Sequence, residues 1–325
     1  MKSLRLNAFA PPAESVELAE VAAPRPGPSQ VLVAVEAAAI NPSDFLIING
    51  RYGTLPTLPA RLGAEGVGVV IDVGDDVDRG RIGERVLLVS SSLIGTWSEQ
   101  AVVDAAEAVP QDGAADPVQL AMLGINPATA YGLLHDFVTL RPGDWVVQTG
   151  GNSAVSRTVT ALALHYGVRT LSLVRRPAAA AEIADLGAVV VTDEHLAENI
   201  QKALAGDQPA LLLDPIGGPL PAAAADAVRP GGTVVSYGAM SGASTVLPPG
   251  RLVFRKLVLR GFWLNHWRAE TPAADVARIY QELAELVAKG VLWSPVEATY
   301  PITEFQEALA HAQRPGRTGK VLFRF

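Results

Sequence analysis

Hydrophobic positions change their period along the chain at about residue 120. Before that point, short apolar runs are separated by turn residues, as in VLVAVEAAAI (31–40) and the glycine-rich GAEGVGVVIDV (63–73). Apolar, β-branched runs bounded by Gly, Pro, Asn and Asp are typical of strands. Asn41-Pro42 closes the first run, because the residue before a proline is held in an extended or turn conformation. Residues 1–120 therefore predict a compact β-rich domain.

After residue 120, continuous apolar runs alternate with stretches of helical period. Strands are predicted for five runs: WVVQ (145–148), TLSLV (170–174), AVVVT (188–192), ALLLD (210–214) and TVVSYG (233–238). Helices are predicted between most of them, at TVTALALHY (158–166), AAAEIADLG (179–187), HLAENIQKALA (195–205) and PAAAADAV (221–228). This alternation indicates βαβ units and a parallel sheet buried on both faces. The predicted fold class is α/β, with a doubly wound parallel sheet.

The C-terminal third adds one more strand and helix to this alternation, and the residues after them follow a different pattern. KLVLRGFWL (256–264) predicts a final strand, and residues 273–290 predict a helix that ends at Gly290, a C′ glycine. Residues 291–325 predict a strand, a short helix and a strand that return to the first domain. The expected domains are therefore 1–120 plus 291–325, and 121–290.

Composition limits the classes of function. The 325 residues are 49% hydrophobic and 18% charged, which is typical of a soluble globular protein. The absence of cysteine excludes disulfides, thiolate zinc sites and a cysteine nucleophile. A net charge of −7 argues against a nucleic-acid partner. We see no signal peptide and no apolar run of membrane-spanning length, so we expect a cytoplasmic protein with a small-molecule substrate.

The strand–turn–helix over residues 145–166 predicts a dinucleotide site. Backbone N–H groups and the helix dipole favour a pyrophosphate at such a helix N-terminus. The spacing G-x-G-x-x-G falls on Gly151, Asn152, Ser153, Ala154, Val155 and Ser156. Only the first glycine is present, but the other residues are small enough for close approach of the backbone. The alternative is a simple turn capped by Asn152 or Ser153.

The end of the second strand of this region suggests which dinucleotide binds. An NAD site usually carries an acid there, for the ribose 2′-hydroxyl, whereas this chain has Arg175 and Arg176. A guanidinium suits the 2′-phosphate of NADP. We therefore expect NADPH rather than NADH, with a solvated arginine loop as the alternative.

Taken together, these features resemble the medium-chain dehydrogenase/reductase superfamily over essentially the full length. Three segments are similar to its 2-enoyl thioester reductases: NPSDFLIINGRYGTLPTLPARLGAEG (41–66), QTGGNSAVS (148–156), and SYGAMSG with RLVFRKLVLRGFWLNHW (236–267). The resemblance implies a Rossmann NADP-binding domain over residues 121–290. It also implies a GroES-like β-rich catalytic domain over residues 1–120 plus 291–325.

The zinc ligands of the superfamily's alcohol dehydrogenases have no counterpart here. Their cysteine and histidine positions match Asn41 and Ala64. The five histidines lack ligand spacing, and the one glutamate of this motif, Glu65, is expected to be structural. We therefore expect no zinc and no alcohol dehydrogenase activity, because carbonyl–alcohol interconversion loses its usual Lewis acid.

Reduction of a C=C bond conjugated to a thioester needs less electrophilic activation than reduction of a carbonyl group. Hydride adds to the β-carbon, charge moves to the thioester oxygen, and an acid protonates the α-carbon. Tyr52 matches the catalytic tyrosine of the enoyl reductases. A phenol stays protonated at neutral pH and donates directly or through a water. The alternative is a loop tyrosine whose ring packs on the domain surface.

The resemblance implies further site residues. It places Trp263 beside the substrate, and backbone groups of Phe262, Trp263 and Leu264 near the nicotinamide carboxamide. Both aromatic rings are alternatively core side chains. Asn41 resembles the family asparagine near the nicotinamide ribose, with a turn residue before Pro42 as the alternative. The other expected cofactor residues are Tyr237, Gly238, Ala239, Met240 and Lys320.

Three functions remain open. The first is an NADPH-dependent reductase of trans-2-enoyl thioesters, carried by CoA or an acyl-carrier protein, with Arg251, Arg255, Lys256 and Arg260 as a basic patch for the carrier. The second is a reductase of quinones or small enones. The third is a non-catalytic NADPH-binding protein, suggested by Ala154 and Ser156 in place of glycines. The resemblance also implies a homodimer.

Overall fold

The chain forms two compact units in the computed structural model, which describes residues 1–89, 93–111, 115–192 and 194–325. Unit 1 comprises Met1–Ile125 and Arg268–Phe325, and unit 2 comprises Asn126–Trp267. Unit 2 is therefore an insertion in the sequence of unit 1. The expected division placed residues up to 290 with the nucleotide domain, whereas the contacts place Arg268 onward in unit 1.

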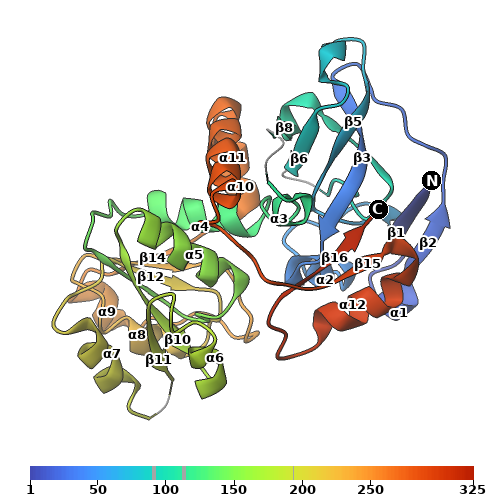
Figure 1. The fold of residues 1–325 in the computed structure, drawn as a ribbon. Helices are drawn as coiled ribbons and strands as arrows, with labels where there is room; N and C mark the ends of the chain where they lie inside the picture. Colours follow the sequence, from blue (N-terminus) through green and yellow to red (C-terminus); the bar gives the residue numbers. More distant parts are fainter. Residues whose placement is uncertain (90–92, 112–114, 193) are drawn as a thin grey trace. The chain divides into compact units, whose positions relative to one another are not determined.

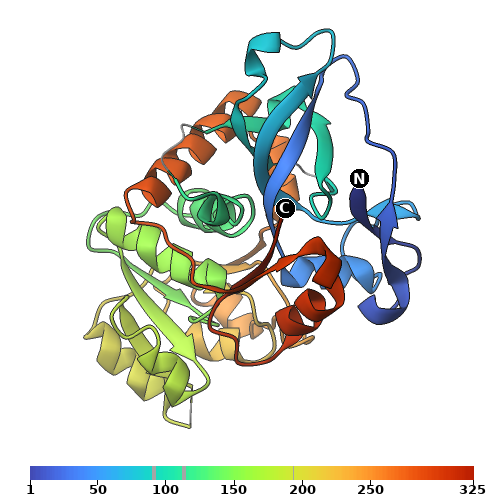
Figure 2. The ribbon, with the colours of Figure 1, turned by 45° about the vertical axis from the view of Figure 1, so that its right-hand side comes forward.

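Unit 1 is built on sheets whose strands pair antiparallel, except for the parallel pair β15 and β16. In its described part, a three-stranded sheet runs in the order β2 (Val16–Glu20), β1 (Lys2–Leu6), β4 (Ala60–Arg61). The larger sheet runs β15 (Val296–Pro301), β16 (Lys320–Arg324), β3 (Gln30–Ala39), β5 (Glu65–Val73), β6 (Arg85–Val89), β8 (Ala108–Pro110), with β7 (Gln100–Asp104) on β3. The long strands β3 and β5 lie side by side in both views of the ribbon (Figures 1 and 2). The β-rich class predicted for this part of the chain is confirmed.

Helices and short 3₁₀ turns close the ends of unit 1. The helices are α1 (Pro12–Ser15), α2 (Pro42–Ile48), α3 (Pro117–Leu120), α11 (Ala273–Ala288) and α12 (Phe305–Gln313). The 3₁₀ turns are Arg79–Arg81, Ala105–Glu107 and Ile302–Glu304. Helix α11 ends as predicted, with Gly290 at φ +70°, in the left-handed region that favours glycine.

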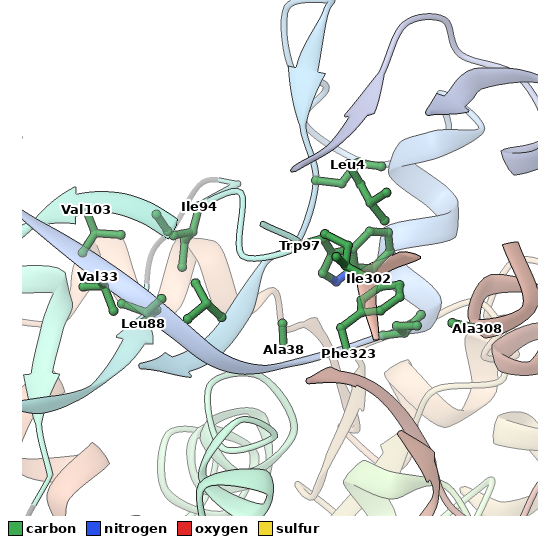
Figure 3. Close-up of a cluster of buried hydrophobic side chains, with 14 of the residues drawn as sticks. Leu4, Val33, Ala38, Leu88, Ile94, Trp97, Val103, Ile302, Ala308 and Phe323 are labelled. Carbon is green, nitrogen blue, oxygen red and sulfur yellow. The ribbon is translucent and has the colours of Figure 1, made fainter. Parts of the chain in front are cut away.

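The core of unit 1 is a cluster of buried aliphatic side chains around two aromatic rings (Figure 3). Trp97 and Phe323 are both fully buried, and their rings meet edge to face with centroids 5.4 Å apart. The indole N–H of Trp97 donates to the backbone oxygen of Ala39 at 3.1 Å. The C-terminal strand is thereby packed against residues from the beginning of the chain.

Unit 2 is a parallel sheet in the doubly wound order. Its described strands follow the order β11 (Ala188–Val191), β10 (Arg169–Val174), β9 (Trp145–Gln148), β12 (Leu211–Asp214), β13 (Thr233–Ser236), β14 (Val258–Gly261). Every pairing in it is parallel. The strand order reverses beside β9, and such a reversal creates the crevice in which α/β proteins bind ligands.

The helices of unit 2 pack around this sheet (Figure 1). They are α4 (Asn126–His135), α5 (Ala154–His165), α6 (Pro177–Ala181), α7 (Leu196–Leu204), α8 (Leu220–Ala224) and α9 (Pro249–Val253), and α10 (Leu264–Glu270) spans the unit boundary. Helix α5 packs on β10, and α7 packs on β11. The predicted strands are confirmed except the last, which ends at Gly261 because Leu264 already begins α10.

Three side chains of unit 1 bind the backbone where the chain leaves for unit 2. The Tyr280 hydroxyl donates to the backbone oxygen of Gly124 at 2.7 Å. The guanidinium of Arg268, the first residue after unit 2, donates to the same oxygen. The Glu65 carboxylate accepts the N–H of Ile125 at 2.7 Å. The chain therefore leaves unit 1 and returns to it at neighbouring points.

Candidate active site

Helix α5 begins with a side-chain cap directly after the turn that follows β9. The hydroxyl of Ser153 accepts the N–H of Ser156 at 3.2 Å and donates to its hydroxyl at 2.9 Å. The residues of the first turn, Ala154 and Val155, keep backbone N–H groups that no helical carbonyl reaches. A twelve-residue helix concentrates partial positive charge there, so this end suits an anion.

Gly151 is needed for packing. A Cβ on Gly151 would lie 2.5 Å from the Cβ of Ser172 in β10, which is closer than real side chains approach. Its N–H donates to the backbone oxygen of Leu173 at 3.0 Å. The turn is thus pressed against the neighbouring strand, and Asn152 follows it with its backbone oxygen 3.4 Å from Nε of Arg157.

Tyr237 brings a third hydroxyl to the same turn. It follows β13, and its hydroxyl is buried without a hydrogen bond of normal geometry to any described residue. Burial raises the pKa of Tyr237 above its ordinary value, while the adjacent hydroxyls of Ser156 and Ser153 act in the opposite direction. A buried hydroxyl without a partner is costly unless a ligand or water completes it. This orphaned group therefore fits a site for a polar ligand.

The turn after β12 is organised by a carboxylate. Asp214 is fully buried and accepts bonds from the Thr149 hydroxyl at 2.5 Å and from the Gly217 N–H at 3.0 Å. The segment Tyr237–Met240 runs beside this turn, since Met240 N–H donates to the oxygen of Pro215 at 2.9 Å. Within this segment, a Cβ on Gly238 would lie 2.9 Å from the same oxygen. Ala239 and Met240 are exposed.

These turns meet at one edge of the sheet. The residues predicted from the sequence follow β9, β10 and β13, which with β12 are neighbours in one parallel sheet, so their carboxyl ends lie together. Arg175 and Arg176 follow β10 and are both exposed. A phosphate near this edge therefore finds helix N–H groups, small side chains and two guanidinium groups.

The aromatic residues after β14 have different surroundings. Phe262 packs inside unit 2, where a Cβ on Gly132 would lie 2.7 Å from its ring and Phe137 lies 6.1 Å away, edge to face. Trp263 is half-buried, with its ring 4.6 Å from that of His266. Leu264 is buried at the start of α10. The Phe262 ring thus packs within unit 2, and the role expected for its backbone stays a prediction.

In unit 1, Tyr52 follows α2. It is half-buried and its ring packs against the cluster of Figure 3. Two residues before it, Gly50 has φ +67°, and a Cβ there would lie 3.0 Å from the Cβ of Phe9. A left-handed turn that only glycine adopts readily therefore sets the start of the Tyr52 loop.

A buried polar network lies beside the N-terminus of α2. The Asn41 amide nitrogen donates to Glu65 at 2.7 Å, and its oxygen accepts from the Lys320 ammonium. Asp44 accepts the backbone N–H of Asn41 at 2.7 Å, as the third residue of the helix that Asn41 caps. All four side chains are buried, so the network gathers two carboxyls and one ammonium away from water.

Burial shifts the pKa of each charged group in the network. It raises the pKa of Asp44 from 3.8 to about 7, with the Asn41 N–H opposing and the Glu65 charge adding to the rise. Burial also raises the pKa of Glu65, against the pull of Lys320, and lowers the pKa of Lys320. One oxygen of Asp44, Oδ1, has no hydrogen-bond partner among the described residues.

The residues at the zinc position of the alcohol dehydrogenases do not fit zinc. Asn41 offers only an amide oxygen, which the Lys320 ammonium already holds, and Ala64 offers a methyl group. A fixed cation beside the first position disfavours a second one. Within residues 1–89, 93–111, 115–192 and 194–325, no group of three His, Cys, Asp or Glu side chains is arranged to hold a metal ion.

Part of the predicted basic patch is already paired with a carboxylate within unit 2. Arg251 lies in α9, not on a strand, and pairs with Asp226. Arg255 lies 3.7 Å from the same carboxylate and donates to the backbone oxygen of Asp226 at 2.9 Å. Arg260 lies over the Phe137 ring at 5.3 Å, and Lys256 is exposed. Of these four residues, only Arg260 lies on a strand, in β14.

Sequence reasoning assigned no role to three polar groups near these residues: the carboxyls of Asp44 and Asp214 and the hydroxyl of Ser156. Asp44 stands third in a helix opened by Asn-Pro, and this spacing is that of a capping box. Asp214 stands at the end of an apolar run, where parallel strands present their polar ligand-binding ends. Both signals were therefore present in the sequence.

Two family models together match most of the chain. Residues 27–150 match the alcohol dehydrogenase GroES-like domain, and residues 154–281 match the domain described as zinc-binding dehydrogenase. None of the helices in the described residues is long and apolar enough to cross a membrane.

Similar proteins cover the full length. The mitochondrial enoyl-[acyl-carrier-protein] reductase of Xenopus tropicalis is 37% identical over 317 residues, which cover 94% of this chain and 89% of that protein. The human enzyme is also 37% identical, with 94% and 83% covered. A solved structure from Bacillus thuringiensis, assigned as an NADPH:quinone reductase, is 27% identical with a TM-score of 0.93, covering 100% of this chain and 98% of that one.

Proposed function

Because this chain belongs to the medium-chain dehydrogenase/reductase superfamily, close to its enoyl reductases, we propose that it is an NADPH-dependent 2-enoyl thioester reductase. The observation that carries the proposal is the 37% identity to enoyl-[acyl-carrier-protein] reductases, which extends over 94% of the chain. Matches limited to the nucleotide turn would support only an oxidoreductase of unspecified substrate. The alignment extends instead over nearly the whole chain.

NADPH is the proposed cofactor. The N-terminus of α5, with Ser153 as cap, would hold the pyrophosphate, and the orphaned Tyr237 hydroxyl would donate to it. Arg175 and Arg176 are exposed after β10 and would pair with the 2′-phosphate. No acid follows this strand to select the free 2′-hydroxyl of NADH.

The chemistry assigned to the chain is protonation and positioning. When bound, NADPH supplies a hydride for the β-carbon of the enoyl group. The Tyr52 hydroxyl then gives a proton to the α-carbon, directly or through a water, as the C=C bond becomes a single bond. Trp263, on unit 2, would lie against the acyl group, and no step of this scheme needs a metal ion.

The carrier of the acyl group is proposed to be CoA or an acyl-carrier protein. Arg251 and Arg255 are already paired with Asp226, so their charge is partly neutralised within the unit. Lys256 and Arg260 are exposed and available to a phosphate. The chain therefore offers a small basic surface, which favours a single phosphate group over a broad acidic protein face.

The test is NADPH oxidation, followed by the absorbance of the reduced nicotinamide, with crotonyl-CoA beside a simple quinone. We expect oxidation with crotonyl-CoA, dependence on NADPH over NADH, and saturated acyl-CoA as product. Tyr52→Phe serves as the matched variant, because it keeps the ring and removes only the acid. No turnover of crotonyl-CoA by the folded wild type would refute the proposal.

A second function is reduction of quinones or small enones. It is favoured by the Bacillus thuringiensis structure, which is assigned to that activity and has the same fold. A quinone reductase needs no proton donor at Tyr52. Turnover of the quinone alone, unchanged in Tyr52→Phe, would select this function. Stoichiometric NADPH binding without turnover of any substrate would instead select a non-catalytic role.

We also propose a homodimer formed through strand β14. This strand ends the described sheet of unit 2 and pairs only with β13, and its residues are exposed. Val258 is 44% and Leu259 is 41% exposed, so the free edge carries apolar side chains. Light scattering after size exclusion should give twice the chain mass of 34.0 kDa. Leu259→Lys should lower the measured mass towards that of a single chain.

A further inference from the structure

Tyr300, His311 and Glu297 of unit 1 form a line of three polar side chains, here called the relay. The Tyr300 hydroxyl lies 2.8 Å from Nδ1 of His311, and Nε2 of the same ring lies 2.9 Å from Oε1 of Glu297. Tyr300 and Glu297 are on β15, and His311 is on α12, which packs against that strand. A hydroxyl bonded to an imidazole that a carboxylate orients is the arrangement of an activated nucleophile.

A β-bulge brings both ends of the relay to one side of the strand. Glu297 and Tyr300 are three residues apart, so in a regular strand their side chains would point to opposite faces. The register of β15 against β16 shifts between Val296 and Ala298, which pair with consecutive residues of β16. Glu297 is thus the extra residue of a bulge, and bulges re-aim side chains. Both side chains therefore reach the one ring of His311.

The carboxylate end of the relay fixes the tautomer of the ring. The Glu297 carboxylate also accepts the N–H groups of Thr318 at 2.8 Å and Gly319 at 3.1 Å. The bond from His311 lowers the pKa of Glu297, so this carboxyl is ionised at neutral pH. An ionised carboxylate only accepts, so Nε2 carries the proton, and Nδ1 of the neutral ring accepts from the Tyr300 hydroxyl. The ring is therefore set as a base toward the phenol.

We propose that Tyr300 is an acyl-acceptor site, at which His311 acts as general base for attack of the phenol on an activated ester. In this step the phenol oxygen bonds to the carbonyl carbon of the ester, and the bond from that carbon to the leaving group breaks. The hydroxyl proton passes to Nδ1 of His311, which releases it to the leaving group. The product is an aryl ester of Tyr300, and no oxidation or reduction takes place. The site is separate from the proposed reductase chemistry, in which none of the three residues takes part.

The competing role of the relay is purely structural. It joins α12 to β15 and holds the backbone before β16, so it would stabilise unit 1 without any reaction. Its exposure fits access by a small molecule, since 12% of the His311 side chain and 27% of the Glu297 side chain are exposed and Tyr300 is half-buried. Both roles predict a loss of stability when the relay is broken, but only the acceptor role predicts a reactive phenol.

Acetylation by para-nitrophenyl acetate separates the two roles. The full chain is treated for increasing times, and the acetylated fraction of each tyrosine is measured by mass spectrometry of its peptides. Tyr166, a half-buried tyrosine of unit 2, is the reference in the same digest. We expect Tyr300 to react about tenfold to a hundredfold faster than Tyr166, because assistance by a general base contributes about a hundredfold or more at its best.

Variants of the other two residues test their roles. His311→Gln keeps an amide N–H for Glu297 and removes the basic nitrogen, so Tyr300 should react no faster than Tyr166. Glu297→Gln removes the charge that orients the ring and should slow the reaction of Tyr300 by about tenfold. His195→Gln, at an exposed histidine of unit 2, is the matched control and should leave the rate at Tyr300 unchanged. Circular dichroism and urea unfolding verify the fold of each variant.

Each outcome decides the proposal. Equal rates at Tyr300 and Tyr166 in wild type, or an unchanged rate at Tyr300 in folded His311→Gln, would overturn the acceptor role and leave the structural one. The wild-type comparison needs no variant, so it decides even if a variant does not fold. Oxidation of NADPH with crotonyl-CoA is measured separately, and neither result affects the other.

Discussion

Asp44→Asn tests whether a buried carboxyl of the network keeps its proton in the folded protein. Burial raises the pKa of Asp44 from 3.8 to about 7, and the side chain is 1% exposed. The charged groups that face it are Glu65 on β5 and Lys320 on β16, the first raising and the second lowering this pKa. Asparagine keeps an acceptor for the Asn41 N–H and has no charge at any pH.

Proton linkage gives the direction in which stability changes with pH. Between the unfolded pKa of 3.8 and the folded pKa of about 7, the folded state binds more protons than the unfolded chain, so stability falls as pH rises through this window. At about 1.4 kcal/mol per pKa unit, the stability lost through Asp44 reaches about 4 kcal/mol above pH 7 and vanishes well below pH 4. Of this, roughly 2 to 3 kcal/mol develops between pH 5 and pH 8.

The assay is urea unfolding of wild type and Asp44→Asn at pH 5, 6, 7 and 8. The free energy of unfolding of the variant should rise relative to wild type by about 2 to 3 kcal/mol across this range. Any constant cost of the new amide cancels, because only the change with pH is compared. Asp75→Asn, at an exposed aspartate, is the control and should show no such trend. A variant-minus-wild-type difference that is the same at pH 5 and pH 8 would refute the reasoning.

Four further outcomes are expected. Tyr52→Phe should lower kcat with crotonyl-CoA by about a hundredfold, with NADPH Kd unchanged by titration. Arg175→Ala should raise Kd for NADPH by about tenfold and leave NADH binding as it is, since only NADPH carries the 2′-phosphate. Ser153→Ala removes the cap of α5 and should cost about 1 kcal/mol in urea unfolding. Gly151→Ala should cost about 1 to 3 kcal/mol, because its Cβ meets β10; an unchanged unfolding midpoint would contradict that packing.

The nucleotide sheet was predictable because its inner strands are buried on both faces. A run such as ALLLD (210–214) is apolar at every position when neither face meets water, and β12 lies in the middle of the sheet. The last predicted strand failed for the opposite reason. Its apolar residues include Phe262, which packs against Gly132 and Phe137 outside the ladder. Hydrophobicity alone does not say which neighbour a side chain meets.

The network around Asn41 shows the corresponding limit for the site. Asn41 and Lys320 are 279 residues apart in the chain, so no local pattern connects them. Sequence reasoning placed both with the cofactor through family resemblance and treated Glu65 as structural. The contact that joins the three depends on the pairing of β16 with β3, which brings the end of the chain beside its beginning. Tertiary pairing of this kind produces no periodic pattern in the sequence.

The shared bonds at Gly124 carry a consequence for the ancestry and engineering of this chain. The side chain of Arg268 reaches the carbonyl of Gly124, so the two ends that deletion of residues 126–267 would create lie within about one side-chain length. A bridge of a few residues should therefore reconnect them, so unit 2 is a separable insertion. An inserted unit whose ends meet in this way can be exchanged between genes by recombination at its two ends, without interrupting a strand of unit 1.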